Sequence, residues 1–286
     1  MKHFFVITNP LKDPDLEHTR QIEDFLRQSG CVCNVQVKRE NDAGGQTYTD
    51  VSQIPEDTQC ILVLGGDGTL IEAARDTVGM NIPLLGINFG TLGFLAEVEK
   101  NGVRHALTFL MEDNYETESR MMLDGGHCRG DVCLERSFAL NDIVITRTGS
   151  LRIIHFHIYV NGQFLNEYNA DGIIISTPTG STGYNLSAGG PIVEPKARLM
   201  VITPICPHTL NTRSIVLSAE DEIVVEMEAG KGNEVFQAEV NFDGGHMAAL
   251  EVGDRIVVTK SEKTADIVKL SKRSFVEALH KKMSEK

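Results

Sequence analysis

The sequence contains no apolar run that approaches the about 20 residues a helix needs to cross a bilayer. The apolar stretch after Met1 stops at Thr8-Asn9-Pro10, so we expect a first strand there rather than a secretory leader. None of the six cysteines forms a Cys-x-x-Cys pair, which argues against a zinc ribbon. Free thiols of a cytoplasmic protein are the favoured interpretation.

Basic residues are scarce. The chain has 27 Lys and Arg against 40 Asp and Glu, which gives a net charge of −13. An acidic chain is a poor partner for nucleic acid or an anionic membrane, so we expect neither. If the chain binds a nucleotide, local backbone amides and a metal ion must hold it against the overall field. The length of 286 residues fits one large or two ordinary globular domains.

The pattern of predicted elements changes near residue 115. Before it, strands alternate with helices, which predicts a Rossmann-like α/β domain with a parallel sheet, over residues 1–118. After it, the apolar period becomes two, which predicts a mostly antiparallel β-sandwich domain over 119–271. The tail 272–286 is basic and helix-prone, and it either packs back on the first domain or frays. The expected strands lie at 3–8, 31–37, 60–64, 83–87, 137–147, 154–160, 173–176, 199–203, 215–217, 223–228, 235–241, 247–251, 255–259 and 265–270, and the expected helices at 15–29, 70–78 and 103–112.

A glycine-rich turn, Gly65-Gly66-Asp67-Gly68-Thr69, joins a predicted buried strand to a predicted helix. Backbone amides at such a helix start favour phosphate, so we expect the glycines and Thr69 to bind phosphate groups. The turn lacks the Gly-Lys-Thr ending of a P-loop. A carboxylate in a phosphate-binding turn repels the phosphate and lowers its affinity, so we expect this carboxylate to have a function. Asp67 could accept a proton or hold a metal, and the sequence leaves both roles open.

A second glycine-rich turn, from Asn88 to Leu95, follows the next predicted strand. Ligands of parallel sheets bind beyond the carboxyl ends of the strands. The two turns are therefore expected to face one site.

Polar residues interrupt the second half at two places. Asn141-Asp142 breaks an apolar strand, as ribose- or metal-binding residues would, or as a solvent-facing bulge would. Asn169-Ala170-Asp171-Gly172 leads through a short strand into a long loop, Ser176 to Pro191, rich in hydroxyls and glycine. Such a loop suits a sugar-phosphate, with Tyr184 able to stack on a base, although a linker is the simpler alternative.

Two histidine motifs are less specific. His155 and His157 share one face of a strand, but no carboxylate or cysteine is obviously placed with them, so a polar cross-strand face is favoured over a metal site. His208 ends the rigid turn that starts at Thr203, and a site role and a turn hydrogen bond are equally supported. We expect no dedicated protein cage for a metal.

Taken together and in this order, the motifs Gly65–Thr69, Asn141-Asp142, Thr177–Tyr184 and Pro204–His208 resemble those of the NAD kinase family. Ser119–Leu123 and Asn241–Gly244 also look like signatures of that family. The glycine–aspartate turn alone is shared with diacylglycerol, sphingosine and phosphofructokinase-type kinases, so the specificity comes from the combination. One departure is Gly245, which stands where many members have Gln.

The resemblance implies transfer of the γ-phosphoryl group of ATP to the 2′-hydroxyl of the adenosine ribose of NAD. It also implies a divalent metal (Mg), a cytoplasmic location and a homodimer or homotetramer. Asp67 would be the catalytic carboxylate. The NAD-binding residues implied by position are Asp67, Gly68, Phe94, Asn141, Asp142, Arg152, Asn169, Asp171, Thr182, Gly183, Tyr184, Asn185, Leu186 and Ser187, and the phosphates of ATP would lie on Gly65, Gly66, Gly68 and Thr69.

Two other functions are compatible with parts of the sequence. A lipid kinase would share the glycine–aspartate turn, but it offers no reason for the strand break at Asn141-Asp142. A non-catalytic nucleotide sensor would bind NAD without forming NADP, and the presence of Asp67 argues against it.

Overall fold

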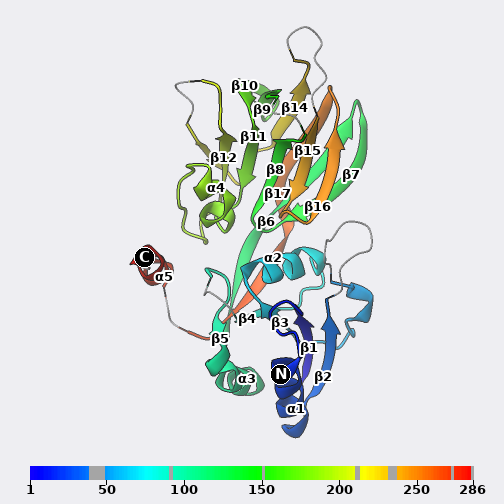
Figure 1. Ribbon diagram of the computed structural model, residues 1–286, viewed down its shortest axis with the longest axis vertical. Coiled ribbons are helices and arrows are strands. Elements are labelled where there is room, and N and C mark those ends of the chain that lie inside the picture. The colour runs from blue at the N-terminus through cyan, green and yellow to red at the C-terminus, as the bar shows by residue number, and fades with distance from the viewer. Residues whose placement is uncertain are drawn as a thin grey trace. The chain divides into compact units, whose positions relative to one another are not determined.

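The computed structural model describes residues 1–38, 49–89, 93–149, 152–209, 213–230, 237–271 and 274–284 (Figure 1). The chain divides into two compact units, one of residues 1–120 and 264–286 and one of residues 121–263. Two long strands, β6 (Glu116–Arg129) and β17 (Asp254–Lys269), carry the chain from one unit to the other. Among the described helices, none is both long and apolar enough to span a membrane.

The first unit is an α/β structure, as predicted. Its strands pair in parallel in the order β4-β3-β1-β2, and β5 and the end of β17 add to β4. Buried side chains from this sheet pack with those of α1 and α3, which contact each other. The elements are β1 (His3–Thr8), α1 (Glu17–Gln28), β2 (Val32–Val37), η1 (Val51–Gln53), β3 (Cys60–Gly65), α2 (Asp67–Asp76), β4 (Leu84–Asn88), β5 (Val98–Glu99), η2 (Lys100–Gly102), α3 (Val103–Met111) and α5 (Phe275–Ser284).

The second unit is a β-sandwich, also as predicted. One sheet has the antiparallel order β13-β12-β11-β8-β15-β16, and the other joins β10, β9 and β14 to β17, with β6 and β7 beyond. Alternate residues of both sheets face one buried core, in which Ile143 and Val240 meet Phe156 and Ile158. The further elements are β7 (Val132–Ala139), β8 (Asp142–Arg147), β9 (Ile154–Val160), β10 (Gln163–Ala170), β11 (Gly172–Ser176), η3 (Gly180–Thr182), α4 (Tyr184–Ser187), β12 (Leu199–Ile205), β13 (Ile215–Ser218), β14 (Ile223–Glu228), β15 (Ala238–Phe242) and β16 (His246–Leu250).

Three expectations about strands were wrong. The single strand expected at 137–147 is two strands, because the chain turns at Leu140 and Asn141 between β7 and β8. The two strands expected at 255–259 and 265–270 are one continuous strand, β17. The sequence did not predict β6, β10 or the first part of β7, because their exposed or polar residues break the apolar alternation. The strand expected at 235–241 begins at residues 235 and 236, which lie outside the described residues.

One local prediction was confirmed, and a second stays a prediction. Asn161 and Gly162 both have positive φ, 50° and 74°, and connect the antiparallel pair β9 and β10, as a two-residue hairpin turn requires. The C-terminal tail forms helix α5, and its Phe275 ring lies 6.2 Å from the ring of Phe94 in the same unit. The expectation that the tail packs back on the first domain stays a prediction, and this ring pair is the contact that supports it.

Candidate active site

The glycine-rich turn stands at the carboxyl end of β3, where Gly65 ends the strand and Asp67 begins α2. The N-cap residue Gly66 makes no side-chain cap, and among the described residues no side chain is seen to accept from the first amides of the helix. A Cβ added to Gly66 or Gly68 would meet nothing within 4 Å. Open space over uncapped amides at the positive end of a helix is an arrangement that binds phosphate.

The side chain of Thr69 lies beneath the turn. Its hydroxyl accepts a hydrogen bond from the Asn9 amide at 3.2 Å, and only 6% of the residue is exposed. A Cβ on Gly65 would come within 2.4 Å of that hydroxyl, so the position requires glycine. Thr69 thus supports the turn with its side chain.

The Asp67 carboxylate is held by the second glycine-rich segment. Oδ2 accepts the backbone N–H of Phe94 at 2.7 Å, and Oδ1 accepts those of Leu95 at 3.3 Å and Ala96 at 3.1 Å. A carboxylate offers about four lone-pair directions, so one on Oδ2 remains for a substrate. The expectation that the two turns come together is confirmed for residues 93–96, whereas residues 90–92 lie outside the described part of the chain.

Gly93 makes this arrangement possible. A Cβ at this position would lie 1.9 Å from Oδ2 of Asp67 and 2.0 Å from its Cγ. The φ angle of Gly93 is not in the positive range, so the requirement for glycine is steric. The carboxylate is therefore closed in by backbone on one side and has its remaining lone pair on the other.

In the β-sandwich unit, the break between β7 and β8 is organised by a carboxylate that the sequence reading did not place in the site. Asp243 accepts the backbone N–H groups of Leu140 at 2.7 Å, Asn141 at 2.8 Å and Asp142 at 3.1 Å. Its own N–H donates to the carbonyl of Asp142 at 3.1 Å. These bonds replace ladder bonds at the corner, which explains why the strand cannot continue through Asn141.

The start of the hydroxyl- and glycine-rich loop fixes the same corner from another direction. Thr177 donates its N–H to the carbonyl of Asn141 at 2.8 Å and its hydroxyl to the carbonyl of Leu140 at 2.6 Å. The Thr177 hydroxyl in turn accepts the N–H of Gly180 at 3.1 Å. A Cβ on Gly180 would stand 2.2 Å from the Asn141 carbonyl oxygen, so glycine lets the two segments touch.

Asp142 is 7% exposed and lies near the charge of Asp243. Burial first, and then the negative charge of Asp243, raises the pKa of the Asp142 carboxyl to about 7. A carboxyl with such a pKa exchanges its proton near neutral pH, and it can donate to or accept from a sugar hydroxyl.

The loop that follows β11 is ordered by its own side chains and is not a linker. Asn185 is fully buried, and its amide donates to the carbonyls of Ser181 at 3.1 Å and Pro191 at 3.0 Å. Its Oδ1 accepts the hydroxyl of Thr203 at 2.7 Å. Because this side chain is engaged inside the protein, a ligand contact at Asn185 would have to use the backbone.

Tyr184, in contrast to the buried Asn185, is 46% exposed. Burial of the phenol raises the pKa of Tyr184, and the charges of Cys206, Asp142 and Asp171 push it in the same direction. The Tyr184 hydroxyl is therefore within electrostatic range of the Asp142 and Asp171 carboxylates. An exposed aromatic ring is suited to stack on a flat ligand.

Asp171 is paired with a residue that the sequence reading missed. The guanidinium of Arg147, at the end of β8, donates to Asp171 Oδ1 from Nε at 2.7 Å. The pair raises the pKa of Arg147 and neutralises the charge of Asp171. Nothing local in the sequence connects residues 147 and 171, since only the antiparallel pairing of β8 with β11 brings them together.

Two predicted site residues carry buried side-chain oxygens that lack a hydrogen-bond partner within the described chain, Asn141 Oδ1 and Asn169 Oδ1. Native proteins seldom leave such groups unsatisfied, and an absent ligand is one explanation. His208, next to them in the fold, donates its backbone N–H to the Asn169 carbonyl at 2.8 Å, and it is exposed.

The remaining predicted NAD-binding residues of this unit lie at its surface or partly exposed. Arg152, Leu186 and Ser187 are exposed, whereas Thr182 and Gly183 are half-buried. The structure therefore brings Asn141, Asp142, Asp171 and Tyr184 into one neighbourhood, and Gly65–Thr69 and Phe94 into another, each inside its own unit.

His157 does have carboxylates beside it, contrary to the sequence reading. Its Nδ1 lies 3.1 Å from Glu228 Oε1, and ligand atoms of His157, Glu226 and Glu228 lie within 4.8 Å of one another. All three are partly exposed on neighbouring strands β9 and β14, where cross-strand ion pairs of this kind are ordinary.

The fold and these two groups of residues define a nucleotide-binding protein with a phosphate-binding α/β unit and a β-sandwich unit. Comparison with known families makes this specific. A family model described as ATP-NAD kinase N-terminal domain matches residues 4–115, and one described as ATP-NAD kinase C-terminal domain matches residues 140–270.

Curated relatives extend the match to the whole chain. An NAD kinase of Lachnospira eligens is 48% identical over 99% of this chain and 100% of its own length, and one of Agathobacter rectalis is 49% identical over 99% of both. The chain belongs to the NAD kinase family, whose members are ATP-dependent enzymes.

Two solved structures share the fold at 24% identity. A crystal structure of yeast NADH kinase complexed with NADH has a TM-score of 0.86 and covers 99% of this chain and 88% of that one. An NAD kinase from Archaeoglobus fulgidus in complex with ATP has a TM-score of 0.74, with 98% of both chains covered.

Proposed function

We propose that this chain transfers the γ-phosphoryl group of ATP to the 2′-hydroxyl of the adenosine ribose of NAD, with Asp67 as the group that receives the hydroxyl proton. The observation that supports this role is the enclosure of the Asp67 carboxylate by the N–H groups of Phe94, Leu95 and Ala96. Three bonds fix the carboxylate in one orientation and leave one lone pair of Oδ2 for the attacking hydroxyl.

Phosphoryl transfer depends mainly on positioning and on neutralising phosphate charge. The uncapped amides that follow Gly66 supply donors at the start of α2 without an opposing side chain. The open space above Gly66 and Gly68 admits a phosphate to these donors. This turn would therefore hold the transferred phosphate beside Asp67.

NAD recognition falls to the β-sandwich unit. Asn141 and Asn169 each present an unsatisfied buried amide oxygen, which a ribose hydroxyl or the carboxamide of nicotinamide can satisfy by donating. Asp142 lies beside them and can accept a further hydroxyl. The exposed Tyr184 ring offers a flat surface for a base.

A divalent cation fits this site as a partner of the ATP phosphates. The one remaining lone pair of Asp67 Oδ2 is assigned to the attacking hydroxyl, so phosphates and water would hold the cation. When bound, the cation would neutralise phosphate charge. Homodimer or homotetramer assembly and a cytoplasmic location remain predictions from the resemblance.

Replacing Asp67 by Asn tests the proton-accepting role. We expect kcat to fall by about 10²–10⁴-fold, the usual contribution of a general base, while the Kd of NAD changes by less than about threefold. The assay follows NADP formation from NAD and Mg-ATP with an NADP-specific dehydrogenase. Asp24→Asn, on the exposed face of α1, is the matched control and should leave kcat unchanged.

Two outcomes would contradict the proposal. Full kcat in the Asp67→Asn enzyme would remove Asp67 from the proton transfer. Labelled product from ATP and diacylglycerol, with none from NAD, would identify a lipid kinase instead.

A further inference from the structure

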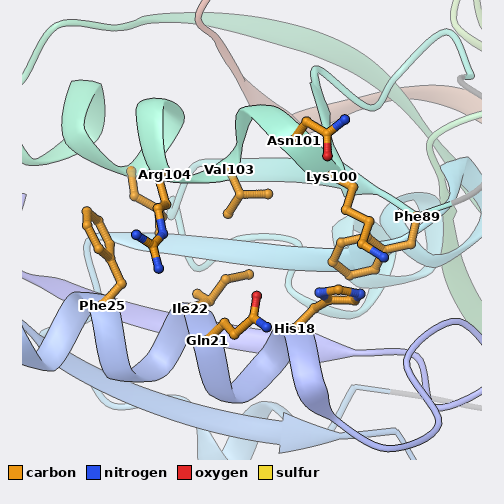
Figure 2. A pocket seen from close by; sticks show the side chains of 10 residues that line it. His18, Gln21, Ile22, Phe25, Phe89, Lys100, Asn101, Val103 and Arg104 are labelled. Carbon is orange, nitrogen blue, oxygen red and sulfur yellow. The ribbon is translucent and has the colours of Figure 1, made fainter.

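A cavity of about 190 Å³ lies inside the α/β unit, between α1 and the segment formed by η2 and α3 (Figure 2). It is separate from the glycine-rich turn and from every residue assigned above to NAD or ATP. Its lining residues are His18, Gln21, Ile22, Phe25, Phe89, Lys100, Asn101, Val103, Arg104 and Leu107.

The floor of the cavity is apolar. Ile22, Val103 and Leu107 belong to the buried core of the unit, and the rings of Phe25 and Phe89 pack against that core. Such a surface favours a compact hydrocarbon body over water.

The rim is cationic, which is unusual in a chain with a net charge of −13. Arg104 and Lys100 stand at opposite ends of the cavity, with Ile22 and Val103 between them (Figure 2). Across the described residues, neither cation lies within 4.0 Å of a carboxylate, whereas the neighbouring Arg27 is paired with Glu23 at 2.6 Å.

The aromatic side chains hold the rim in place. The guanidinium carbon of Arg104 lies 5.8 Å from the ring centre of Phe25, and the His18 ring lies 5.0 Å from that of Phe89. Cation–π contact orients Arg104 over the apolar floor while its N–H groups remain free for an anion.

From this combination we propose that the cavity is a second binding site, for a small organic carboxylate with a compact apolar ring. The carboxylate lies against Arg104, which can bind it with two parallel N–H donors, and Lys100 adds positive potential. The ring fills the space over Ile22, Val103 and Leu107. The proposal does not depend on the kinase activity.

The cavity also adjoins the catalytic turn through one residue. The ring of Phe89 lines the cavity, and its backbone N–H donates to the carbonyl of Gly65 at 3.2 Å. The amide resonance of Phe89 should therefore report occupancy from a position that is bonded to the turn.

Titration with benzoate, followed by amide NMR of the full chain, tests the proposal. We expect saturable shifts at Gln21, Phe89, Asn101 and Arg104 that persist with NAD and a non-hydrolysable ATP analogue at saturation. Acetate carries the charge without the ring and benzamide the ring without the charge, so both should bind at least about tenfold more weakly.

Three variants locate the ligand. Arg104→Gln should weaken benzoate binding by about tenfold. We expect no larger effect, because Arg104 is exposed and solvent weakens its ion pair with the carboxylate. Gln21→Trp should abolish binding by filling the mouth of the cavity, with NAD kinase kinetics unchanged. Arg20→Gln is the matched control, because Arg20 is an exposed cation on the same helix but does not line the cavity.

The proposal is overturned if benzoate gives no saturable shifts, or if Arg104→Gln and Gln21→Trp bind it as well as the wild type does. It is also overturned if NAD and the ATP analogue displace benzoate, because the anion would then occupy the phosphate-binding turn. Benzoate binding is measured independently of NAD phosphorylation, so these results can be interpreted even if the chain proves inactive in the kinase assay.

Discussion

Substitution of Gly93 by Ala is a sharp test of how the Asp67 carboxylate, the proposed proton acceptor, is positioned. The added Cβ would lie 1.9 Å from Asp67 Oδ2, whereas ordinary contact begins at 3.4 Å, so the carboxylate and residue 93 must separate by about 1.5 Å. Because φ at this position is not positive, alanine adds no backbone strain of its own there.

The expected loss can be estimated from that displacement. A misplacement of about 1 Å at a reacting group can cost about 10²-fold in rate. We therefore expect kcat of the Gly93→Ala enzyme to fall by at least about 10²-fold, approaching that of Asp67→Asn. The KM for NAD should change little, because the residues proposed to bind NAD in the β-sandwich unit are untouched.

A double-mutant cycle makes the test specific. If Gly93 acts only through the Asp67 carboxylate, then Gly93→Ala should cost nothing further in an Asp67→Asn background. Gly102→Ala is the matched control, since its Cβ would meet Val98 Cγ1 at an ordinary 3.5 Å. Retention of kcat in Gly93→Ala, or fully multiplicative losses in the double mutant, would refute the reasoning.

Three further predictions concern the β-sandwich unit. The pKa of Asp142 is raised to about 7, so the folded state binds more protons than the unfolded state between about pH 4 and pH 7. Urea titrations should therefore show that the free energy of unfolding falls as the pH rises through that window. Asp142→Asn should remove this pH dependence. If the unfolding free energies of the wild type and the variant change equally with pH, the assignment to Asp142 is contradicted. Gly180→Ala would drive a Cβ to 2.2 Å from the Asn141 carbonyl oxygen, and steady-state kinetics should show KM for NAD raised roughly tenfold with a smaller change in kcat. Asn185→Ala removes three buried hydrogen bonds and should lower the unfolding free energy by about 2–4 kcal/mol in denaturant titration, whereas a loss below about 0.5 kcal/mol would show that the loop does not depend on them.

The parts of the site that lie within one short segment could be predicted from the sequence. The turn Gly65–Thr69 contains the end of a strand, several small residues and the start of a helix. Each of these features can be recognised from residues that are neighbours in the sequence. The change of apolar period near residue 115 is likewise a local signal, and the domain boundary that it suggests between residues 118 and 119 stays a prediction.

The residues that position these segments could not be predicted, because their partners are distant in the chain. Asp243 lies 101 to 103 residues from the amides that it accepts, and Arg147 lies 24 residues from Asp171. Asp243 did carry one local signal, since an Asp-Gly pair with positive φ marks a turn. Its task at the corner of β7 and β8 is a property of the pairing of β15 with β8.

The two carboxylates Asp67 and Asp243 use the same bonding pattern for different ends. Each accepts three N–H groups from consecutive residues of a distant segment. For Asp67 the result is a fixed carboxylate with a lone pair to spare, whereas for Asp243 the result is a fixed corner that presents Asn141 and Asp142. Each set of bonds closes within one unit. We therefore expect the geometry around Asp67, the proposed proton acceptor, to be independent of the geometry around Asn141 and Asp142, which are proposed to bind NAD. Losses in kcat from Gly93→Ala and in NAD affinity from Gly180→Ala should therefore combine additively in free energy.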